Sequence, residues 1–285
     1  MNPAFAGALC ALALGSADFA GRFSTRALGA PSAWLGTLVA GTIVLTVWIA
    51  ATDAPLAWNV DGLPYAAANG IATTVMTLLL YMALARGPVS VAAPIVGSHP
   101  VLVVAFWVLL GARPSAIQWL AMAVTILGAV IVARSVEGQA EASNRSSLRI
   151  TIGLACASCL AYAVLVIGGQ AAAPHYGPLE TLWLGRLFSI ASVLAVFAFA
   201  RRSPTMPLRW WPFLGAQGLL DASGYLALFA GSTGEGQAIA AVAGSGFGAV
   251  TVLLARVILK ERMGLLQWLG IVLVFAGVAV LASQG

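Results

Sequence analysis

Residues 264–283 read GLLQWLGIVLVFAGVAVLAS, an apolar run without a single charged side chain. A helix crosses the hydrocarbon core of a bilayer with about 20 residues of this kind. Residues 115–134, SAIQWLAMAVTILGAVIVAR, have the same length and character. Both runs carry a Gln-Trp-Leu triplet, starting at Gln118 and Gln267, and a glycine eight residues after its leucine, at Gly128 and Gly277. The sequence therefore predicts two related membrane-spanning helices.

The composition of the whole chain agrees with this prediction. Hydrophobic residues make up 61% of the 285 positions and charged residues 8%, against about 45–50% and about 25% in soluble domains. So few charges cannot cover the surface of a water-soluble protein of this size. The net charge of +5 comes from scattered residues that form no stripe along which a phosphate backbone would lie. Soluble enzymes, nucleic-acid binders and disordered scaffolds are excluded.

Apolar runs long enough to span a membrane number ten, and short breaks rich in glycine and proline separate them. The runs are continuous rather than alternating, which favours helices over a β-barrel. Residues 1–3 carry no side-chain cation, so the first run is interpreted as a span rather than a secretory signal. The predicted spans are 3–21, 31–51, 62–85, 89–110, 115–134, 149–171, 179–200, 208–231, 236–257 and 264–283.

Further similarities indicate an internal duplication. The pattern Tyr-x-Ala-Leu-x-x-Gly occurs at 81–87 and 225–231, Gly-Ser at 97–98 and 244–245, and residues 7–11 resemble 153–157. The blocks keep their order at a nearly constant offset, which chance matching of Ala, Leu and Gly does not favour. We therefore expect five-helix repeats at 1–134 and 149–285, joined by a hydrophilic linker at 135–148. An odd number of spans inverts the second repeat, as in many secondary transporters. The predicted fold is an all-α membrane protein with ten transmembrane helices in two inverted five-helix repeats.

The motifs of common enzymes are missing from the sequence. There is no phosphate-binding Gly-x-x-x-x-Gly-Lys loop, and Lys260 is the only lysine. The two histidines, His99 and His175, stand in no metalloprotease pattern, and Gly-x-Ser-x-Gly is absent. The three cysteines lie in apolar runs without nearby metal-ligand partners. We expect a protein that is not an enzyme and that binds no metal or cofactor.

Ionisable residues inside the spans indicate where a cavity lies, because a charge at membrane depth normally faces the bundle interior or water. Arg186 in the seventh predicted span and Asp221 in the eighth lie at similar depths on antiparallel helices, so we expect them to pair. Such a pair either locks two helices together or takes part in substrate carboxylate binding or proton coupling. Asp18, near the end of the first span, is expected to pair with Arg22.

Aromatic and polar residues at mid-span complete the predicted cavity. His99 stands between Ser98 and the helix-kinking Pro100, where it either meets the substrate or bonds a neighbouring helix. Tyrosine and tryptophan either form cavity walls or belong to the interfacial belt. The substrate-cavity candidates are Tyr81, Ser98, His99, Trp107, Tyr162, Arg186, Asp221, Tyr225 and Ser245.

Small residues at equivalent places in the fourth and ninth spans suggest hinges. Glycine is a weak helix former, and proline removes a backbone hydrogen bond. These spans are therefore expected to bend and gate the cavity, the alternative being close packing of small residues. The hinge or gate candidates are Gly97, Pro100, Gly244, Gly246 and Gly248.

A family resemblance rests on Lys260-Glu261-Arg262, on Leu266-Gln267-Trp268-Leu269-Gly270 and on Gly277. These residues resemble the Gly-Glu turn and following helix of the ten-span, EamA-type members of the drug/metabolite transporter superfamily. Ala112 departs from the glutamate of the first such turn. The resemblance implies alternating-access transport of small amphipathic metabolites. It is nearest to the YddG-like branch, which exports aromatic and other amino acids across the plasma membrane. The alternatives are a nucleotide-sugar or drug transporter of the same fold, or a non-transporting structural or regulatory subunit.

The basic residues predict an orientation in the cell (inner) membrane. One cation, Arg113, lies in a loop after an even-numbered span, and Arg186 is intramembrane. The other twelve lie after odd-numbered spans: Arg22, Arg26, Arg86, Arg134, Arg145, Arg149, Arg201, Arg202, Arg209, Arg256, Lys260 and Arg262. The positive-inside rule then places odd loops in the cytoplasm and both termini outside. The expected partners are a small-molecule substrate and the lipid bilayer, with no nucleic acid; a monomer and a homodimer both remain open.

Overall fold

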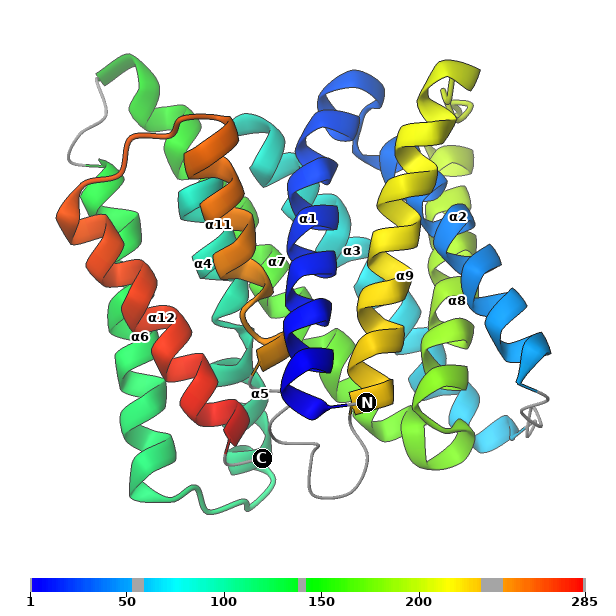
Figure 1. Cartoon of the computed structure of the whole chain (residues 1–285), viewed down its shortest axis with the longest axis horizontal. Helices are drawn as coiled ribbons and strands as arrows, with labels where there is room; N and C mark the ends of the chain where they lie inside the picture. The colour runs from blue at the N-terminus through cyan, green and yellow to red at the C-terminus, as the bar shows by residue number, and fades with distance from the viewer. Residues whose placement is uncertain (1, 53–58, 138–141, 232–242, 284–285) are drawn as a thin grey trace.

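The computed structural model describes residues 2–52, 59–137, 142–231 and 243–283, and these residues form helices joined by short turns (Figure 1). The first repeat contains α1 (Pro3–Leu28), α2 (Ala30–Ala51), the 3-10 turn η1 (Val60–Gly62), α3 (Leu63–Arg86), α4 (Val89–Gly97), α5 (His99–Leu109) and α6 (Ala116–Glu137). The second contains α7 (Ala142–Tyr176), α8 (Pro178–Phe199), η2 (Leu208–Trp210), α9 (Trp211–Gly231), α11 (Phe247–Ile258) and α12 (Leu265–Ser283).

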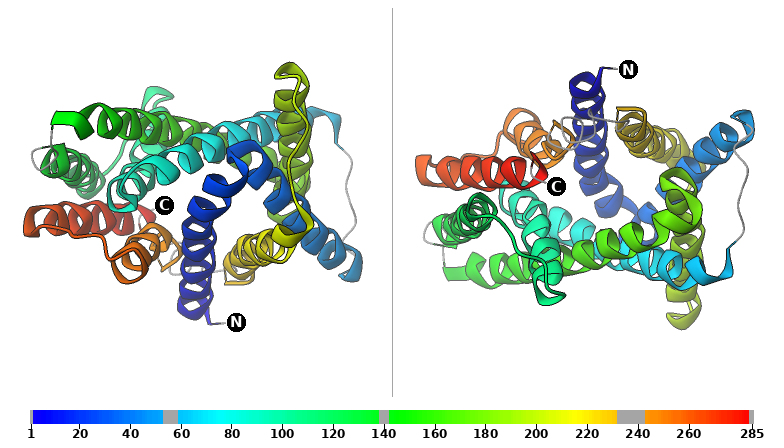
Figure 2. Two further views of the ribbon diagram at one scale, coloured as in Figure 1. Left: turned by 90° about the horizontal axis from the view of Figure 1, so that it is seen from above. Right: turned by 90° about the horizontal axis from the view of Figure 1, so that it is seen from below.

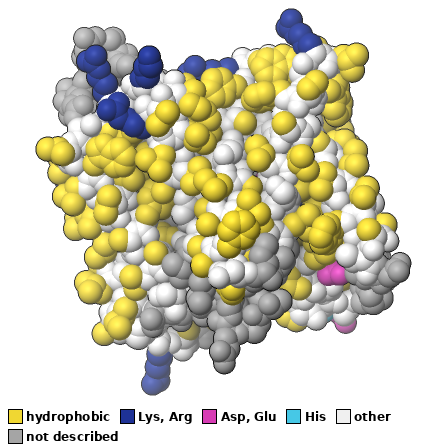
Figure 3. Space-filling view, in the orientation of Figure 1, with side chains coloured by type: hydrophobic (Ala, Val, Ile, Leu, Met, Phe, Trp, Pro, Cys, Tyr) yellow, Lys and Arg dark blue, Asp and Glu magenta, His cyan; other side chains and the backbone are white. Residues whose placement is uncertain are grey.

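The helices follow the predicted spans closely. In the described ranges, eight segments are long and apolar enough to cross a membrane, and α4 with α5 counts as one of them. Helix α9 lies on the predicted eighth span, and α11 lies on the second half of the predicted ninth span, whose residues 236–242 are outside the described ranges. Helix α1 continues to Leu28, beyond its predicted end, and α7 begins earlier than predicted, at Ala142. Hydrophobic side chains cover much of the outer surface (Figure 3), as expected of helices that contact lipid.

Two tight turns show why the first two helices of each repeat form hairpins. Gly29 (φ 79°) ends α1, and Gly177 (φ 90°) follows α7. A positive φ favours glycine, which has no Cβ to clash. Pro31 and Pro178 stand in the first turns of the helices that follow, where a missing N–H costs nothing. A glycine followed within two residues by a proline thus joins the equivalent helix pairs of the two repeats.

The interface between α6 and α12 displays the pseudo-twofold relation. A Cβ on Gly128 would lie 2.7 Å from the carbonyl oxygen of Gly270, so these backbones touch. A Cβ on Gly277 would lie 2.7 Å from the carbonyl oxygen of Ala121. In the aligned repeats, Gly277 is equivalent to Gly128, and Gly270 is equivalent to Ala121. The two contacts are therefore related by the pseudo-twofold symmetry. An interface formed twice by equivalent residues is what a twofold axis between α6 and α12 produces.

The remaining helices are arranged around this axis. Seen from above and below (Figure 2), α6 and α12 lie at one end of an elongated bundle and α2 and α8 at the other. Between them, α3 packs along α7, and α1 packs along α9, again an equivalent pair of contacts. Both chain ends lie at the same end of the bundle (Figure 1), as an even number of spans requires. Lysine and arginine gather mainly at the opposite end (Figure 3).

Candidate substrate cavity

A cavity of about 270 Å³ lies among α1, α3, α7, α8 and α9. Its lining runs from Trp34 and Tyr81 to Ala173 and Pro178, where α7 meets α8. That junction lies at the end of the bundle that carries both termini (Figure 1). The cavity therefore extends from the middle of the bundle toward the terminal face, which is hereafter the face carrying the chain ends. The opposite face is called the basic face.

The cavity extends toward the terminal face because the contact between the first and third helices differs between the two repeats. Helix α1 packs against α3, whereas no comparable contact joins their counterparts α7 and α9 among the described residues. A Cβ on Gly21 of α1 would lie 2.5 Å from the ring of Tyr81 on α3, so the small residue permits this close approach. The α1–α3 contact closes the basic face, and the missing counterpart leaves the terminal side open.

Polar bonds hold the basic face closed. Arg22 Nη1 donates to the carbonyl oxygens of Leu84 at 2.6 Å and Gly87 at 2.7 Å, and Arg26 Nε donates to that of Ala85 at 2.8 Å. Carbonyls at the C-terminal end of a helix have no partners within it and carry partial negative charge, so cations there are stabilising. The two arginines of α1 thus fasten it to the end of α3. The expected Asp18–Arg22 pair is absent, because Arg22 is committed to these carbonyls.

A hydrogen-bonded chain lies behind the inner wall of the cavity. Gln217 Nε2 donates to the Tyr81 hydroxyl at 2.6 Å, and Ser24 Oγ donates to Gln217 Oε1 at 3.0 Å. The rings of Trp34 and Tyr81 meet edge to face with centroids 6.1 Å apart. Because α1, α3 and α9 each contribute one member, the chain fixes the Tyr81 ring at the inner end of the cavity.

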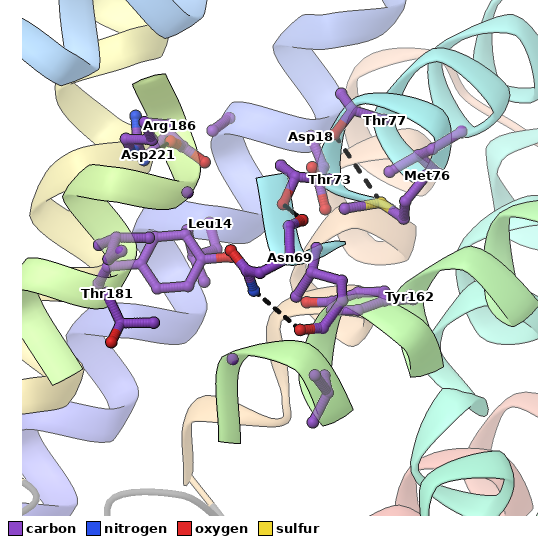
Figure 4. Close-up of a pocket in the computed structure, with 18 of the residues that line it drawn as sticks. Leu14, Asp18, Asn69, Thr73, Met76, Thr77, Tyr162, Thr181, Arg186 and Asp221 are labelled. Carbon is purple, nitrogen blue, oxygen red and sulfur yellow. Dashed lines mark hydrogen bonds and ion pairs between the residues drawn. The ribbon is translucent and has the colours of Figure 1, made fainter. Parts of the chain in front are cut away.

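Arg186 and Asp221 pair as expected. Arg186 Nη2 donates to Asp221 Oδ2, and both side chains line the cavity (Figure 4). The Arg186 side chain is 4% exposed and that of Asp221 is 16% exposed. The guanidinium carbon also lies 5.9 Å from the centre of the Tyr225 ring. Nε and Nη1 of Arg186 are buried without a hydrogen-bond partner in the described structure, and Nη1 lies against Gly41 of α2.

Five of the predicted cavity residues come together in the lining: Tyr81, Tyr162, Arg186, Asp221 and Tyr225. The other four lie outside it. Ser98 lines a separate apolar groove between α4, α5, α6 and α7 and donates to the carbonyl oxygen of Ile95 at 2.6 Å. Trp107 is 42% exposed and donates to Gln170, which does line the cavity. Ser245 lies in the turn before α11.

His99 supports the cavity wall without lining it. Its ring stacks on that of Tyr162 with centroids 3.7 Å apart, and its Nδ1 lies 3.1 Å from the carbonyl oxygen of Val96. This is the carbonyl that Pro100 leaves without its helical partner. The break in the fourth span is therefore satisfied by the histidine and faces away from the substrate space.

The hinge candidates lie at two equivalent helix breaks. Ser98, next to Gly97, separates α4 from α5, and Pro100 stands in the first turn of α5. Gly246 precedes α11, and Gly244 lies within contact distance of Leu228 and Cys10. The ring of Phe275 on α12 lies against Gly97 and, more closely, Gly248. Both breaks thus pack on the same aromatic side chain, and their bending remains a prediction.

Polar residues not predicted for the cavity include Asp18, Asn69, Thr73 and Gln170. Asn69 Nδ2 donates to the carbonyl oxygen of Leu165 at 2.8 Å, which ties α3 to α7 beside the cavity. Asp18 was recognisable as a charge in an apolar run, but its spacing from Arg22 suggested a pair. The amides and threonines gave no such signal, because uncharged polar residues are frequent in membrane helices.

Comparison with known families decides the identity of the fold. The model of the EamA-like transporter family matches residues 1–134 and 149–283. The chain belongs to the EamA-like transporter family. Its members transport small molecules across membranes and are not enzymes. No curated protein matches the chain. A solved structure described only as "Crystal structure of protein" is similar in fold, with a TM-score of 0.64, 17% identity, and coverage of 98% of this chain and 95% of that one.

The Lys260-Glu261 turn, which resembles the Gly-Glu turn of EamA-type transporters, has a structural role in this chain. The Glu261 carboxylate accepts hydrogen bonds from Val89 N at 2.9 Å, Ser90 N at 3.1 Å and Ser90 Oγ at 2.7 Å. Gln267 Nε2 also donates to Ser90 Oγ, at 3.0 Å. A carboxylate at the start of a helix satisfies free N–H groups and interacts favourably with the helix dipole. Glu261 thus joins the end of the ninth span to the start of α4 at the basic face.

Proposed function

We propose that this EamA-like transporter exports aromatic and other amino acids across the cytoplasmic membrane by alternating access. The observation that carries the proposal is a small amphipathic cavity at membrane depth with a single ion pair in its wall. The Arg186 guanidinium attracts the carboxylate of such a substrate. Tyr81, Tyr162, Tyr225 and Trp34 provide apolar and aromatic surface for its side chain.

The size and charge of the cavity argue against the larger substrates of this fold. Its volume of about 270 Å³ lies below the range of about 300–1,000 Å³ typical of sites for drug-sized ligands. A nucleotide sugar also carries a diphosphate, which usually requires several cations. Arg186 is the only lysine or arginine in the described lining. A single small zwitterion therefore fits better than a nucleotide sugar.

We further propose that the basic face is cytoplasmic, so that the cavity described above faces outward. The concentration of arginine and lysine at that face supports this orientation through the positive-inside rule. In an export cycle this state releases substrate, and the α1–α3 contact must open to reload the cavity from the cytoplasm.

Counterflow in proteoliposomes tests the function. Vesicles loaded with unlabelled L-phenylalanine should accumulate radiolabelled phenylalanine or tryptophan, while vesicles loaded with a nucleotide sugar should not. Protein-free liposomes and the variant Gly21→Trp, whose side chain is too large for the α1–α3 contact and should prevent closure of the basic face, serve as controls. Accumulation only with nucleotide sugars or with a hydrophobic drug would assign the alternative substrate class. Absence of counterflow with all three would support a non-transporting role.

A further inference from the structure

One carboxylate in the cavity wall has no protein partner. Asp18 of α1 lines the cavity and makes no hydrogen bond or ion pair with any residue that the structure describes. Arg22, one turn further along the helix, bonds the carbonyl oxygens at the end of α3 instead. Asp18 lies on a different part of the wall from the Arg186–Asp221 pair (Figure 4). The function proposed above does not use it.

The charges of the described lining do not balance without a ligand. Arg186 is compensated by Asp221, and no further arginine, lysine or histidine lines the cavity. When it is ionised, Asp18 leaves one excess carboxylate at membrane depth. An unpaired charge there is costly unless water or a bound group of opposite charge compensates it. This part of the wall is thus complementary to a positively charged group of a ligand.

The surroundings of Asp18 suit an organic cation. Phe247 and Asp18 line both the main cavity and a small recess between α1, α3, α4 and α11. Tyr162 also lines the cavity, and its ring centre lies 6.3 Å from that of Phe247. Aromatic faces attract ammonium groups through their quadrupoles. A carboxylate and aromatic rings in one wall are a favourable environment for a primary ammonium group.

We propose that Asp18 is the ammonium subsite of the transporter. It binds the protonated amino group of the substrate, while the substrate carboxylate is oriented toward Arg186. This assignment rests on the proposed function and deepens it, because it predicts which end of the molecule determines recognition. Compounds with the amino group and an apolar side chain are ligands even without a carboxylate. Compounds that lack the amino group lose the interaction with Asp18.

Three probes separate the two ends of the substrate: L-phenylalanine, phenethylamine, which lacks the carboxylate, and 3-phenylpropionate, which lacks the amino group. Inhibition of phenylalanine counterflow and ligand-induced thermal stabilisation are both measured. The wild-type protein should bind phenethylamine at least about tenfold more tightly than 3-phenylpropionate, because Asp18 has no described partner whereas Arg186 is already paired with Asp221. Equal or weaker binding of phenethylamine would overturn the proposal without any variant.

The variant Asp18→Asn should lose about tenfold or more in affinity for phenylalanine and phenethylamine and keep its affinity for 3-phenylpropionate. Asp18→Glu, which retains the carboxylate, should keep phenethylamine binding. Asp61→Asn is the matched control, because it makes the same change at an exposed position in η1 outside the cavity. Phenylalanine transport that is unchanged in Asp18→Asn would refute the subsite and leave the proposed function intact. Phenethylamine binding without any amino-acid flux would support the subsite and reject the proposed substrate.

Discussion

The contact between Arg186 and Asp221 predicts an unequal double-mutant cycle. In Asp221→Ala, the guanidinium remains buried, with its side chain 4% exposed, and loses its only described hydrogen-bond partner. Removing one partner of a buried ion pair costs about 3–5 kcal/mol. In Arg186→Ala, the stranded carboxylate is 16% exposed and lines the cavity. Water reaches it more easily, so we expect a smaller loss, roughly 1–3 kcal/mol.

Removing both residues leaves no uncompensated charge. The double variant should therefore be no less stable than Asp221→Ala, and the two losses should fail to add by at least about 1 kcal/mol. At roughly 2 °C per kcal/mol for a chain of this size, Asp221→Ala should lower the thermal midpoint in detergent by about 6–10 °C. A fluorescence-detected unfolding assay of the four proteins measures this pattern.

The matched control is the same pair of substitutions outside the cavity, Arg113→Ala and Asp61→Ala, both at exposed positions. These two should each change the midpoint little, and their effects should add. Additive losses at Arg186 and Asp221, or a larger loss in Arg186→Ala than in Asp221→Ala, would contradict the reasoning from burial.

Three further predictions concern gating and orientation. Glu261→Gln should destabilise the closed basic face by about 1–2 kcal/mol, because charge-assisted hydrogen bonds are lost. Thiol labelling of a Ser24→Cys reporter, in a background without native cysteines, should then rise about fivefold or more. Unchanged labelling would argue against this role of Glu261. Gly97→Leu and Gly244→Leu should abolish flux while leaving ligand-induced thermal stabilisation partly intact, if the two breaks bend; normal transport by both folded variants would end the hinge hypothesis. A C-terminal fluorescent protein that matures only in the cytoplasm should stay dark, and a bright fusion would reverse the proposed orientation.

The helical architecture was predictable because it depends on local properties of the chain. The length of each apolar run sets one membrane crossing, and Gly29 and Gly177 mark the hairpin turns. The pairing of Arg186 with Asp221 also followed from depth along two antiparallel helices. Depth is a one-dimensional quantity that residue counting supplies directly.

The direction in which a side chain points around its helix cannot be obtained by counting residues. This is why some predicted cavity residues lie outside the cavity. Ser98 and His99 are at the right depth, but the rotation of α4 and α5 aims Ser98 at an outer groove and His99 behind Tyr162. Asp18 and Arg22 are spaced as an i,i+4 pair, yet the end of α3 competes for the arginine. Such competition arises only when helices distant in sequence are packed together.

In the proposed alternating-access cycle, the pseudo-twofold axis relates the closure of the basic face to that of the terminal face, but the sequence gives the two closures different strengths. Arg22 fastens α1 to α3 at the basic face, and the equivalent residue on α7 is Gly168, which has no side chain. Glu261 caps α4 at the same face, and its counterpart in the first repeat is Ala112. Equivalent polar bonds therefore cannot form at these positions when α7 and α9 close the terminal face. Since a ligand shifts an equilibrium only by its differential affinity for the two states, the empty protein should favour the conformation with a closed basic face, and substrate binding from that face must compensate for the bonds of Arg22 and Glu261.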